Sequence, residues 1–249
     1  MDEKFVNLTE ENIASEHLCC IIRSKKPHPG VEAKRQWLRD RLKEGHIFRK
    51  LDVKGRVFIE YAPVEKAWVP ICGSNFYYIY CLWVDGEFKG KGYAKALMEY
   101  CISDAKSKGM SGICMLGSDK QKGWLSNQAF AKKHGMTEVD STAYGYKLLA
   151  LSFDGTVPSF TDSAKTGRIA SQELTVYYDA QCPFILQRLE GMESYCNENA
   201  IPHSFVCVDT LEKAKSLPCV FNNWAMFCKG EFVSVNLSSA EQISKLTSI

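Results

Sequence analysis

The sequence has no run of about 20 consecutive apolar residues, the length that a helix needs to cross a bilayer. The residues from Met1 to Leu8 mix polar and apolar types and lack the apolar core of a signal peptide. We therefore expect neither a membrane-spanning helix nor a signal peptide.

Neither sign of charge dominates. The 249 residues include 31 lysines and arginines against 29 aspartates and glutamates, a formal net charge of +2. This balance gives no support for a nucleic-acid or anionic-membrane partner. The content of 45% hydrophobic and 24% charged residues is ordinary for a globular protein, and the length suggests one large or two modest domains.

Cysteine is not scarce, at 11 residues, but no two cysteines stand in a C-x-x-C spacing. A zinc ribbon or a dithiol redox motif therefore has no support. The five histidines form no metal-ligand spacing with acidic or cysteine neighbours, so we expect no metal. Several cysteines lie inside apolar runs, where a reduced cysteine behaves as a small hydrophobe. This usage predicts a cytoplasmic protein with reduced thiols.

The most informative stretch reads as a strand, a glycine-rich turn and a helix. Residues Tyr77–Val84 form an aromatic and apolar run that is typical of a buried strand. Residues Tyr93–Lys108 place apolar side chains at helical spacing, and Gly109 is a good helix stop. The apolar strand Gly112–Leu116 follows, and it should lie parallel to the first strand because a helix joins them.

The turn inside this stretch has the features of an anion site. Gly90 and Gly92 let the backbone approach a ligand closely, and the start of the following helix favours an anion. Lys89, Lys91 and Lys95 add positive charge, so a diphosphate suits the turn. A lone G-x-G is more often a tight turn with solvated lysines, and the flanking strand and helix are what favour a ligand here.

The segment Glu87–Ala94 resembles the acetyl-CoA signature of the GCN5-related N-acetyltransferase (GNAT) family. That signature reads Gln or Arg, two residues, Gly, any residue, then Gly or Ala. Glu87 departs from it, because Gln or Arg is usual at that position. The runs Cys81–Val84 and Lys89–Tyr93 resemble the YoaP-like branch of the family, whose members carry a small C-terminal domain. The resemblance covers about residues 4 to 151.

The resemblance implies an enzyme that moves an acetyl group from acetyl-CoA, its co-substrate, to a primary amine by direct attack on the thioester. In the family fold two parallel strands splay apart and their backbone binds the pantetheine. Carried over to this sequence, the resemblance implies coenzyme contacts at Leu82, Trp83, Val84, Lys89, Gly90, Lys91, Gly92, Tyr93, Ala94, Lys95 and Asn127. Asn127 reads equally well as a polar residue at a helix start.

Catalysis by this route needs a group that takes a proton from the amine and an acid near the departing sulfur. Glu60 is the candidate base, alone or through water, with a solvated strand glutamate as the plainer interpretation. Many family members use a tyrosine as the acid, and the matching position here is Ala131. Tyr144 and Tyr146 are the candidate acids instead, with core or rim packing as the alternative. Water-assisted departure of the thiolate and a weak activity also stay open.

The order of elements predicts an α/β fold, and the resemblance implies a GNAT domain with a mixed, splayed sheet over residues 1–151. A polar linker over 152–172 and an accessory domain over 173–249 are expected to follow. The first domain is expected to contain helices at about 9–22, 31–43, 93–108 and 124–134 and strands at 4–8, 46–51, 56–62, 68–72, 77–84, 112–116, 137–140 and 144–151. The accessory domain has a βαβαββα order that looks thioredoxin-like, with its last helix at 239–246.

Two other functions stay open at this point. One is a non-catalytic module that binds CoA or a protein, which Glu87 and Ala131 favour slightly. The other is a redox protein acting through Cys182 at a helix start, but exchange needs a second thiol, and Ile185 stands where it would be. No motif identifies the acceptor amine. Aromatic edge strands favour a homodimer. The basic residues of the first helices, Lys34 among them, read as a solvated face or as a site for an anionic acceptor.

Overall fold

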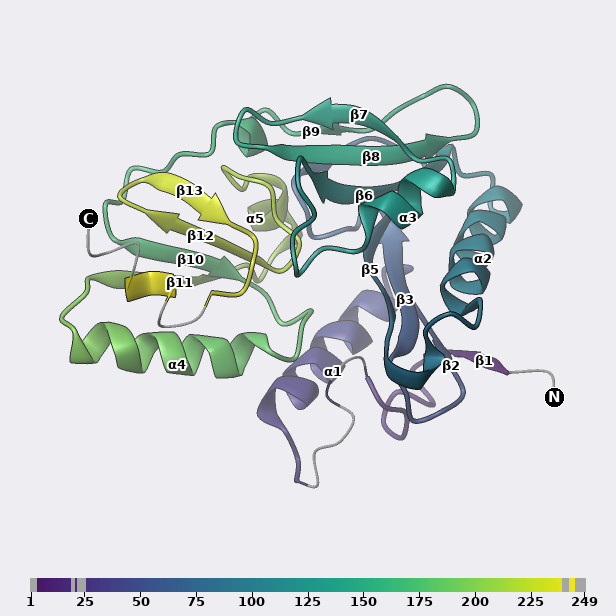
Figure 1. The fold of residues 1–249 in the computed structure, drawn as a ribbon, viewed down its shortest axis with the longest axis horizontal. Coiled ribbons are helices and arrows are strands. Elements are labelled where there is room, and N and C mark those ends of the chain that lie inside the picture. Colours follow the sequence, from purple (N-terminus) through teal and green to yellow (C-terminus); the bar gives the residue numbers. More distant parts are fainter. Residues whose placement is uncertain (1–3, 19–20, 22–25, 239–241, 245–249) are drawn as a thin grey trace.

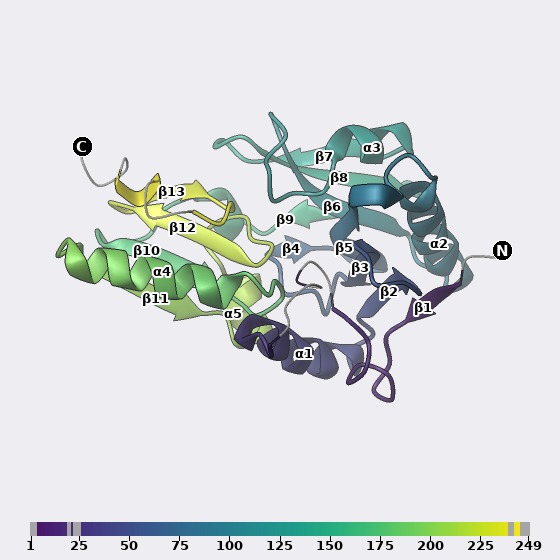
Figure 2. The same cartoon turned by 60° about the horizontal axis from the view of Figure 1, so that its bottom comes forward.

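The structure is a computed structural model, and it describes residues 4–18, 21, 26–238 and 242–244. Two β-sheets lie side by side, with helices packed around them (Figures 1 and 2). One of these has seven strands and the other has four, and a third, small sheet has two. Within the described ranges, no helix combines the length and the apolar character that crossing a membrane requires.

The larger sheet has the strand order β1-β2-β3-β5-β6-β8-β7. Its strands are β1 (Phe5–Asn7), β2 (Ile47–Leu51), β3 (Val57–Pro63), β5 (Phe76–Val84), β6 (Gly112–Ser118), β7 (Thr137–Ser141) and β8 (Tyr146–Ser152). Neighbouring strands are antiparallel except β5 and β6, which are parallel. These two pair only between Phe76–Tyr78 and Gly112–Cys114, so they part toward the end of β5. The predicted mixed, splayed α/β sheet is confirmed.

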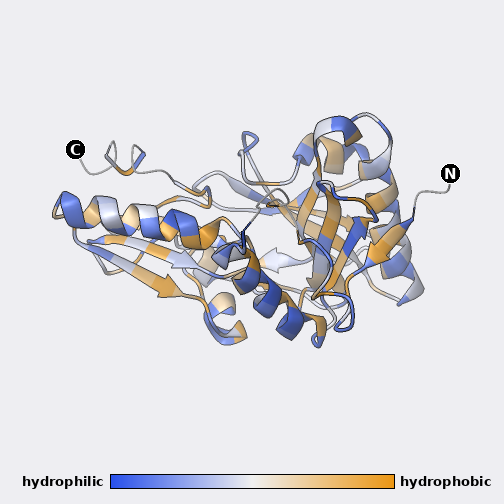
Figure 3. Cartoon of the chain, turned by 90° about the horizontal axis from the view of Figure 1, so that it is seen from below, coloured by the Kyte–Doolittle hydropathy of each residue, from blue (hydrophilic) through white to orange (hydrophobic). Residues whose placement is uncertain are grey.

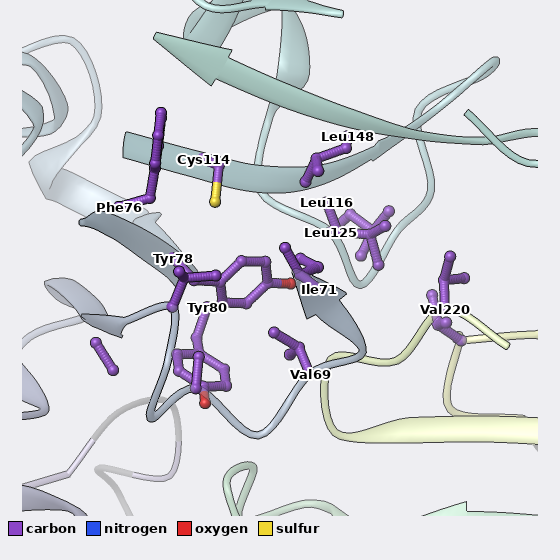
Figure 4. Close-up of a cluster of buried hydrophobic side chains, with 14 of the residues drawn as sticks. Val69, Ile71, Phe76, Tyr78, Tyr80, Cys114, Leu116, Leu125, Leu148 and Val220 are labelled. Atoms are coloured by element: carbon purple, nitrogen blue, oxygen red, sulfur yellow. The ribbon is translucent and has the colours of Figure 1, made fainter. Parts of the chain in front are cut away.

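Strand β5 is apolar on both sides because it fills two cores. Leu97 of helix α2 (Tyr93–Ser107) packs with Ile79 on one face of the sheet. Tyr78 belongs to a second core with Trp37 of helix α1 (Pro29–Leu42). Figure 4 shows part of that second core. Successive strand residues point to opposite faces, so burial on both sides favours a continuous apolar run. The strands of this sheet are accordingly more hydrophobic than α1 (Figure 3).

The smaller sheet has the order β11-β10-β12-β13. It contains β10 (Leu174–Tyr178), β11 (His203–Cys207), β12 (Trp224–Cys228) and β13 (Glu231–Ser234), with helices α4 (Ile185–Glu198) and α5 (Leu211–Lys215). Strand β10 is parallel to β11 and antiparallel to β12. This βαβαββ order agrees with the predicted elements. Most of the predicted last helix lies outside the described residues, and the thioredoxin-like designation stays a prediction.

Hydrogen bonds tie the two sheets together. The hydroxyl of Tyr78 donates to Asn222 Oδ1 at 2.7 Å. Lys215 Nζ donates to the carbonyl oxygens of Val64 and Ile71 at 2.6 and 2.9 Å, and burial lowers the pKa of this lysine to about 8. Strand β4 (Ile71–Cys72), which carries one of these carbonyls, pairs with β9 (Ser159–Phe160). The C-terminal part is therefore packed against the larger sheet.

Helix α1 makes a close approach to the C-terminal part, beside α4 (Figures 1 and 2). A Cβ added at Gly30 would lie 1.9 Å from the carbonyl oxygen of Pro183. No side chain fits at that distance, so the junction requires glycine at this position. It brings α1 next to the loop that precedes α4, where a cavity described below is formed.

The predicted helix at 9–22 is wrong over its described residues, because residues 9–18 form turns. Asn12 Oδ1 accepts the Thr9 N–H at 2.8 Å, and its amide donates to the Asn7 carbonyl. The guanidinium of Arg35 donates to the carbonyl of Ile13. Arg35 thus occupies the Ile13 carbonyl, a backbone group that a helix over this segment would pair internally.

Three boundaries also differ from the prediction. Strand β4 covers only Ile71–Cys72 and lies outside the larger sheet. Helix α3 (Gln128–Lys133) is shorter than expected because Asn127 caps it, its Oδ1 accepting the Phe130 N–H at 2.9 Å. Helix α1 begins at Pro29, two residues before the predicted start at 31, because proline fits the first turn of a helix.

Candidate active site

The glycine-rich turn lies between β5 and α2. Gly90 and Gly92 have φ angles of +78° and +86°, which other L-residues rarely adopt. A Cβ at either position would meet no atom within 4 Å, so the backbone borders open space. The first N–H groups of a helix have no acceptor within the helix and favour an anion. The turn therefore fits the predicted diphosphate.

Ion pairs hold the residues around the turn. Asp85 pairs with Arg56 at 3.2 Å and with Lys89 at 2.7 Å. The hydrogen bond from Lys89 is the main cause that lowers the pKa of Asp85 to about 2. Lys95 lies 3.6 Å from Glu99. Both lysines have mostly exposed side chains, so exchanging these partners for a phosphate costs little.

Two adjoining hollows lie along the turn and the end of β5. The glycine-turn hollow, of about 320 Å³, is lined partly by Gly92 and Lys95. The strand hollow, of about 390 Å³, is lined partly by Leu82 and Asn127. Both hollows share the lining residues Val84, Lys89, Ala94 and Phe130. A ligand can therefore extend from the turn along the splayed strand.

A third space, the interdomain cavity, has a volume of about 240 Å³ and lies between the two sheets. It shares Trp83 and Gly123 with the strand hollow. Residues of β3 and β5 line it on one side, and Gln181–Phe184 and Asn222 line it on the other. The rest of its wall is Lys34, Arg56, Trp124 and Asn223. The three spaces thus follow one another from the glycine turn to the boundary with the C-terminal part.

Glu60 of β3 lines the interdomain cavity and is fully buried. Its Oε2 accepts from Lys34 Nζ at 2.7 Å and from Gln181 Nε2 at 2.7 Å. Its Oε1 lies 3.0 Å from His46 Nε2. Lys34 also donates to the Gln181 carbonyl at 2.6 Å. The predicted base is therefore an ion-paired carboxylate at the junction of both sheets, and the solvated-strand interpretation is wrong.

Electrostatics fix the charge of this cluster. Burial alone would raise the pKa of Glu60, but the Lys34 charge and the hydrogen bonds from His46 and Lys34 outweigh it, and the net pKa is lowered. Burial lowers the pKa of His46 against the opposing pull of Glu60. At neutral pH the cluster therefore holds a carboxylate and a neutral imidazole.

A second buried carboxyl lies beside the cluster. Asp179 is 1% exposed, and its Oδ1 accepts the Gln181 N–H at 2.9 Å. Its Oδ2 has no hydrogen-bond partner in the described part of the chain. Burial raises the pKa of Asp179 to about 7. The segment around Gln181 thus carries a carboxyl that titrates near neutrality, directly behind the cavity wall.

The structure brings the predicted coenzyme residues together. All of them line the glycine-turn hollow or the strand hollow except Lys91, whose Nζ lies 5.8 Å from the centroid of the Phe88 ring. The Leu82 N–H, expected to face the pantetheine, donates to Ser126 Oγ at 2.9 Å. Asn127 lines the strand hollow while its side chain caps α3.

The predicted acids lie elsewhere. Tyr144 Oη donates to the Ala164 carbonyl and accepts the Val220 N–H, and Tyr146 Oη accepts the Val235 N–H at 3.3 Å. Neither tyrosine lines the interdomain cavity with Glu60. Ala131, at the position of the usual tyrosine, is fully buried in the α2 core. The structure therefore does not bring the base and acid candidates together.

Cys182 lies in the wall of the interdomain cavity and is half-buried. Cys81 of β5 lines the same space. Ile185, where a resolving cysteine would stand, is buried in the core of the C-terminal part. Within the described ranges, no group of three or more His, Cys, Asp or Glu residues could hold a metal ion.

Sequence reasoning missed Lys34, His46 and Gln181 as partners of Glu60. Lys34 was expected on a solvated face or at a site for an anionic acceptor, and its 1% exposure contradicts the solvated face. One signal was available: Lys34 precedes the buried Trp37 and Leu38 by three and four residues, a spacing that puts it on the apolar side of α1. The sequence contains no comparable pattern for His46 and Gln181, the other partners of Glu60.

A family model described as "Acetyltransferase (GNAT) family" matches residues 11–136, and a model described as "YoaP-like" matches residues 202–245. The chain therefore belongs to the GNAT acetyltransferase family. A curated relative, the uncharacterized N-acetyltransferase YoaP of Bacillus subtilis (strain 168), is 34% identical over 244 residues, covering 97% of each chain. The predicted family, branch and enzyme class, an acyltransferase, are confirmed.

Solved structures with lower similarity include the ribosomal-protein-S18-alanine N-acetyltransferase of Escherichia coli, at 13% identity and a TM-score of 0.42, covering 62% of this chain and 96% of that one. A GNAT acetyltransferase of Brucella melitensis in complex with acetyl-CoA has 14% identity and a TM-score of 0.40, covering 63% and 92%. At these TM-scores neither structure carries an argument about this chain.

Proposed function

We propose that this protein is an acetyl-CoA-dependent N-acetyltransferase that moves the acetyl group to a primary amine by direct attack on the thioester. The observation that carries the proposal is the series of three adjoining spaces. The glycine-turn hollow takes the diphosphate, the strand hollow takes the pantetheine, and the thioester lies near Trp83, where the interdomain cavity begins. The amine then enters from the interdomain cavity.

Glu60 is the proposed base. It lines the amine side, and its lowered pKa keeps it ionised at neutral pH. The same lowering makes it a weaker base than a carboxylate poised near pH 7. Both oxygens already accept hydrogen bonds, so a proton reaches Glu60 only if one of its partners shifts or a water intervenes. Tyr144 and Tyr146 stay the predicted acids, without support from their positions.

The proposed division of the chain is a GNAT domain at 1–151, a linker at 152–172 and an accessory domain at 173–249. The separate seven-stranded and four-stranded sheets support it. Strand β9, which falls within the proposed linker, pairs with β4 of the proposed first domain. A cytoplasmic location and a homodimer stay predictions.

Titration of acetyl-CoA by calorimetry, followed by measurement of thiol release with a panel of amines, tests the proposal. In Gly92→Glu a carboxylate would face the diphosphate, and we expect acetyl-CoA affinity to fall on the order of 100-fold because like charges repel at close range. Gly155→Glu is the matched control, since Gly155 also has a positive φ (+87°) and open space around its Cβ position. An equal affinity loss in the control would remove the diphosphate assignment.

A second candidate is a non-catalytic module that binds CoA. The buried Ala131 and the fully partnered Glu60 favour it, because neither offers a ready proton donor or acceptor. Acetyl-CoA binding without thiol release for any amine would support this candidate over the enzyme.

A further inference from the structure

We propose that the acceptor is a small primary amine that carries one aromatic ring and no second positive charge, bound in the interdomain cavity. The inference rests on the proposed function and names the substrate of the same site. It assigns a role to the C-terminal part, which closes one side of the amine site.

The walls of the cavity are aromatic on both sides. Phe58, Tyr80 and Trp83 line it from the larger sheet. Trp124 and Phe184 line it at the boundary, with ring centroids 6.0 Å apart and planes at 67°. Aromatic rings favour edge-to-face and offset contacts with another ring. A ligand with an aromatic body therefore matches this wall better than an aliphatic chain.

Two tryptophans of the wall offer contact groups to a ligand. The indole of Trp124 is 42% exposed, unusually high for so large an apolar residue. Trp83 has a buried Nε1 without a hydrogen-bond partner among the described residues, a property that it shares with Trp37, Trp68 and Trp224. A buried indole N–H usually finds an acceptor. Trp124 therefore offers apolar surface to a ligand in the cavity. Trp83 offers an N–H donor at the place where the strand hollow meets the cavity.

The size of the cavity favours a small molecule. Its volume is about 240 Å³. Ligand pockets generally measure about 300–1,000 Å³, so this one suits a molecule at the small end of that range. Residues Gln181–Phe184 and Asn222 form the side opposite β3 and β5, so the space is bounded on two sides.

The charges of the lining exclude a polyamine. Glu60 is the only acidic residue among those lining the cavity in the described part of the chain, and it is already paired with Lys34 at 2.7 Å. Lys34 and Arg56 also line the space, so the formal charge of the lining is positive. A second ammonium group on the acceptor would enter without an unpaired counter-charge among the lining residues, at a considerable desolvation cost.

The test compares phenethylamine and tryptamine with putrescine and with a lysine-containing peptide, by thiol release at saturating acetyl-CoA. We expect kcat/KM for the aromatic amines to be at least tenfold higher. Higher kcat/KM for putrescine or the peptide would overturn the inference and leave the proposed function standing. In parallel, calorimetry measures the binding of tryptamine to the protein in the presence of CoA.

Variants locate the amine. Trp124→Ala should raise the KM for tryptamine at least tenfold without changing acetyl-CoA affinity, while Trp124→Phe should restore most of the loss. Val157→Ala, which removes part of an exposed apolar side chain remote from the cavity lining, should change neither value. Identical KM values in Trp124→Ala and the wild type would contradict the assignment of this wall.

The two proposals fail in different ways. Binding of tryptamine that is lost in Trp124→Ala, without thiol release, would support the aromatic amine site and contradict the transferase activity. Binding of acetyl-CoA with no tryptamine binding and no release would overturn the inference of an aromatic acceptor.

Discussion

The coenzyme side and the acceptor side of this protein are built in opposite ways. The glycine-turn and strand hollows come mainly from two short segments, 82–95 and 121–130, and their polar groups are largely exposed. The interdomain cavity draws Lys34, Glu60 and Gln181 from segments far apart in the chain, and all three are buried. One side uses backbone shape and solvated charge, whereas the other uses a closed network of side chains.

This difference predicts where substitutions will cost stability. The largest effect is expected for Glu60→Gln. Removing one partner of a buried ion pair leaves Lys34 uncompensated, which typically costs about 3–5 kcal/mol. Urea denaturation at pH 7 measures the loss in the free energy of unfolding.

The pH dependence gives the control for Glu60. A lowered folded pKa stabilises the protein above the unfolded value, about 4.3, and that contribution disappears as the pH falls through the folded pKa. The gap between the wild type and Glu60→Gln should therefore narrow in acid. A gap below about 1 kcal/mol at pH 7 would show that the pair contributes little, as at an exposed site.

The next largest effect concerns Asp179. Its pKa is raised to about 7, so the wild type loses stability relative to Asp179→Asn as the pH rises from the unfolded value of about 3.9 toward 7. We expect Asp179→Asn to be more stable by about 2–4 kcal/mol at pH 8 and by less at pH 5, in denaturation measured at both values. Equal stability at the two pH values would mean that Asp179 ionises normally in the folded protein.

The smallest effects are expected for Tyr144→Phe and Tyr146→Phe. Their hydroxyls bond the backbone N–H groups of Val220 and Val235, so each loss should cost about 1 kcal/mol of stability. Their positions give no reason for a large change in kcat. A fall in kcat of a hundredfold or more with little loss of stability would instead support the predicted acid role.

The same difference explains what the sequence could predict. The coenzyme side could be predicted because the strand, Gly90, Gly92 and the helix follow one another directly in the chain. Residues that are close in the sequence are therefore also close in space. The parallel pairing of β5 and β6 followed from the helix between them, whereas the splay was implied by the family resemblance. The helix expected at 9–22 failed because Arg35, far along the chain, takes a carbonyl from that segment.

The acceptor side could not be predicted in the same way. Glu60 and Gln181 are separated by 121 residues and meet only when the two sheets pack. The polar character of Glu60 suggested a solvated strand position, because burial of a carboxylate becomes tolerable only with partners such as Lys34 and His46. No local pattern records those partners.

The central claim is that the reactive end of the coenzyme reaches the interdomain cavity. Bromoacetyl-CoA tests it directly, because a nearby thiolate displaces the bromide and keeps the coenzyme attached through a thioether. Mass spectrometry of the digested protein should find the label on Cys81 or Cys182, which line the cavity. Excess CoA and the Gly92→Glu substitution should both suppress it. Labelling confined to the exposed Cys72 or Cys207, unaffected by CoA, would contradict the account.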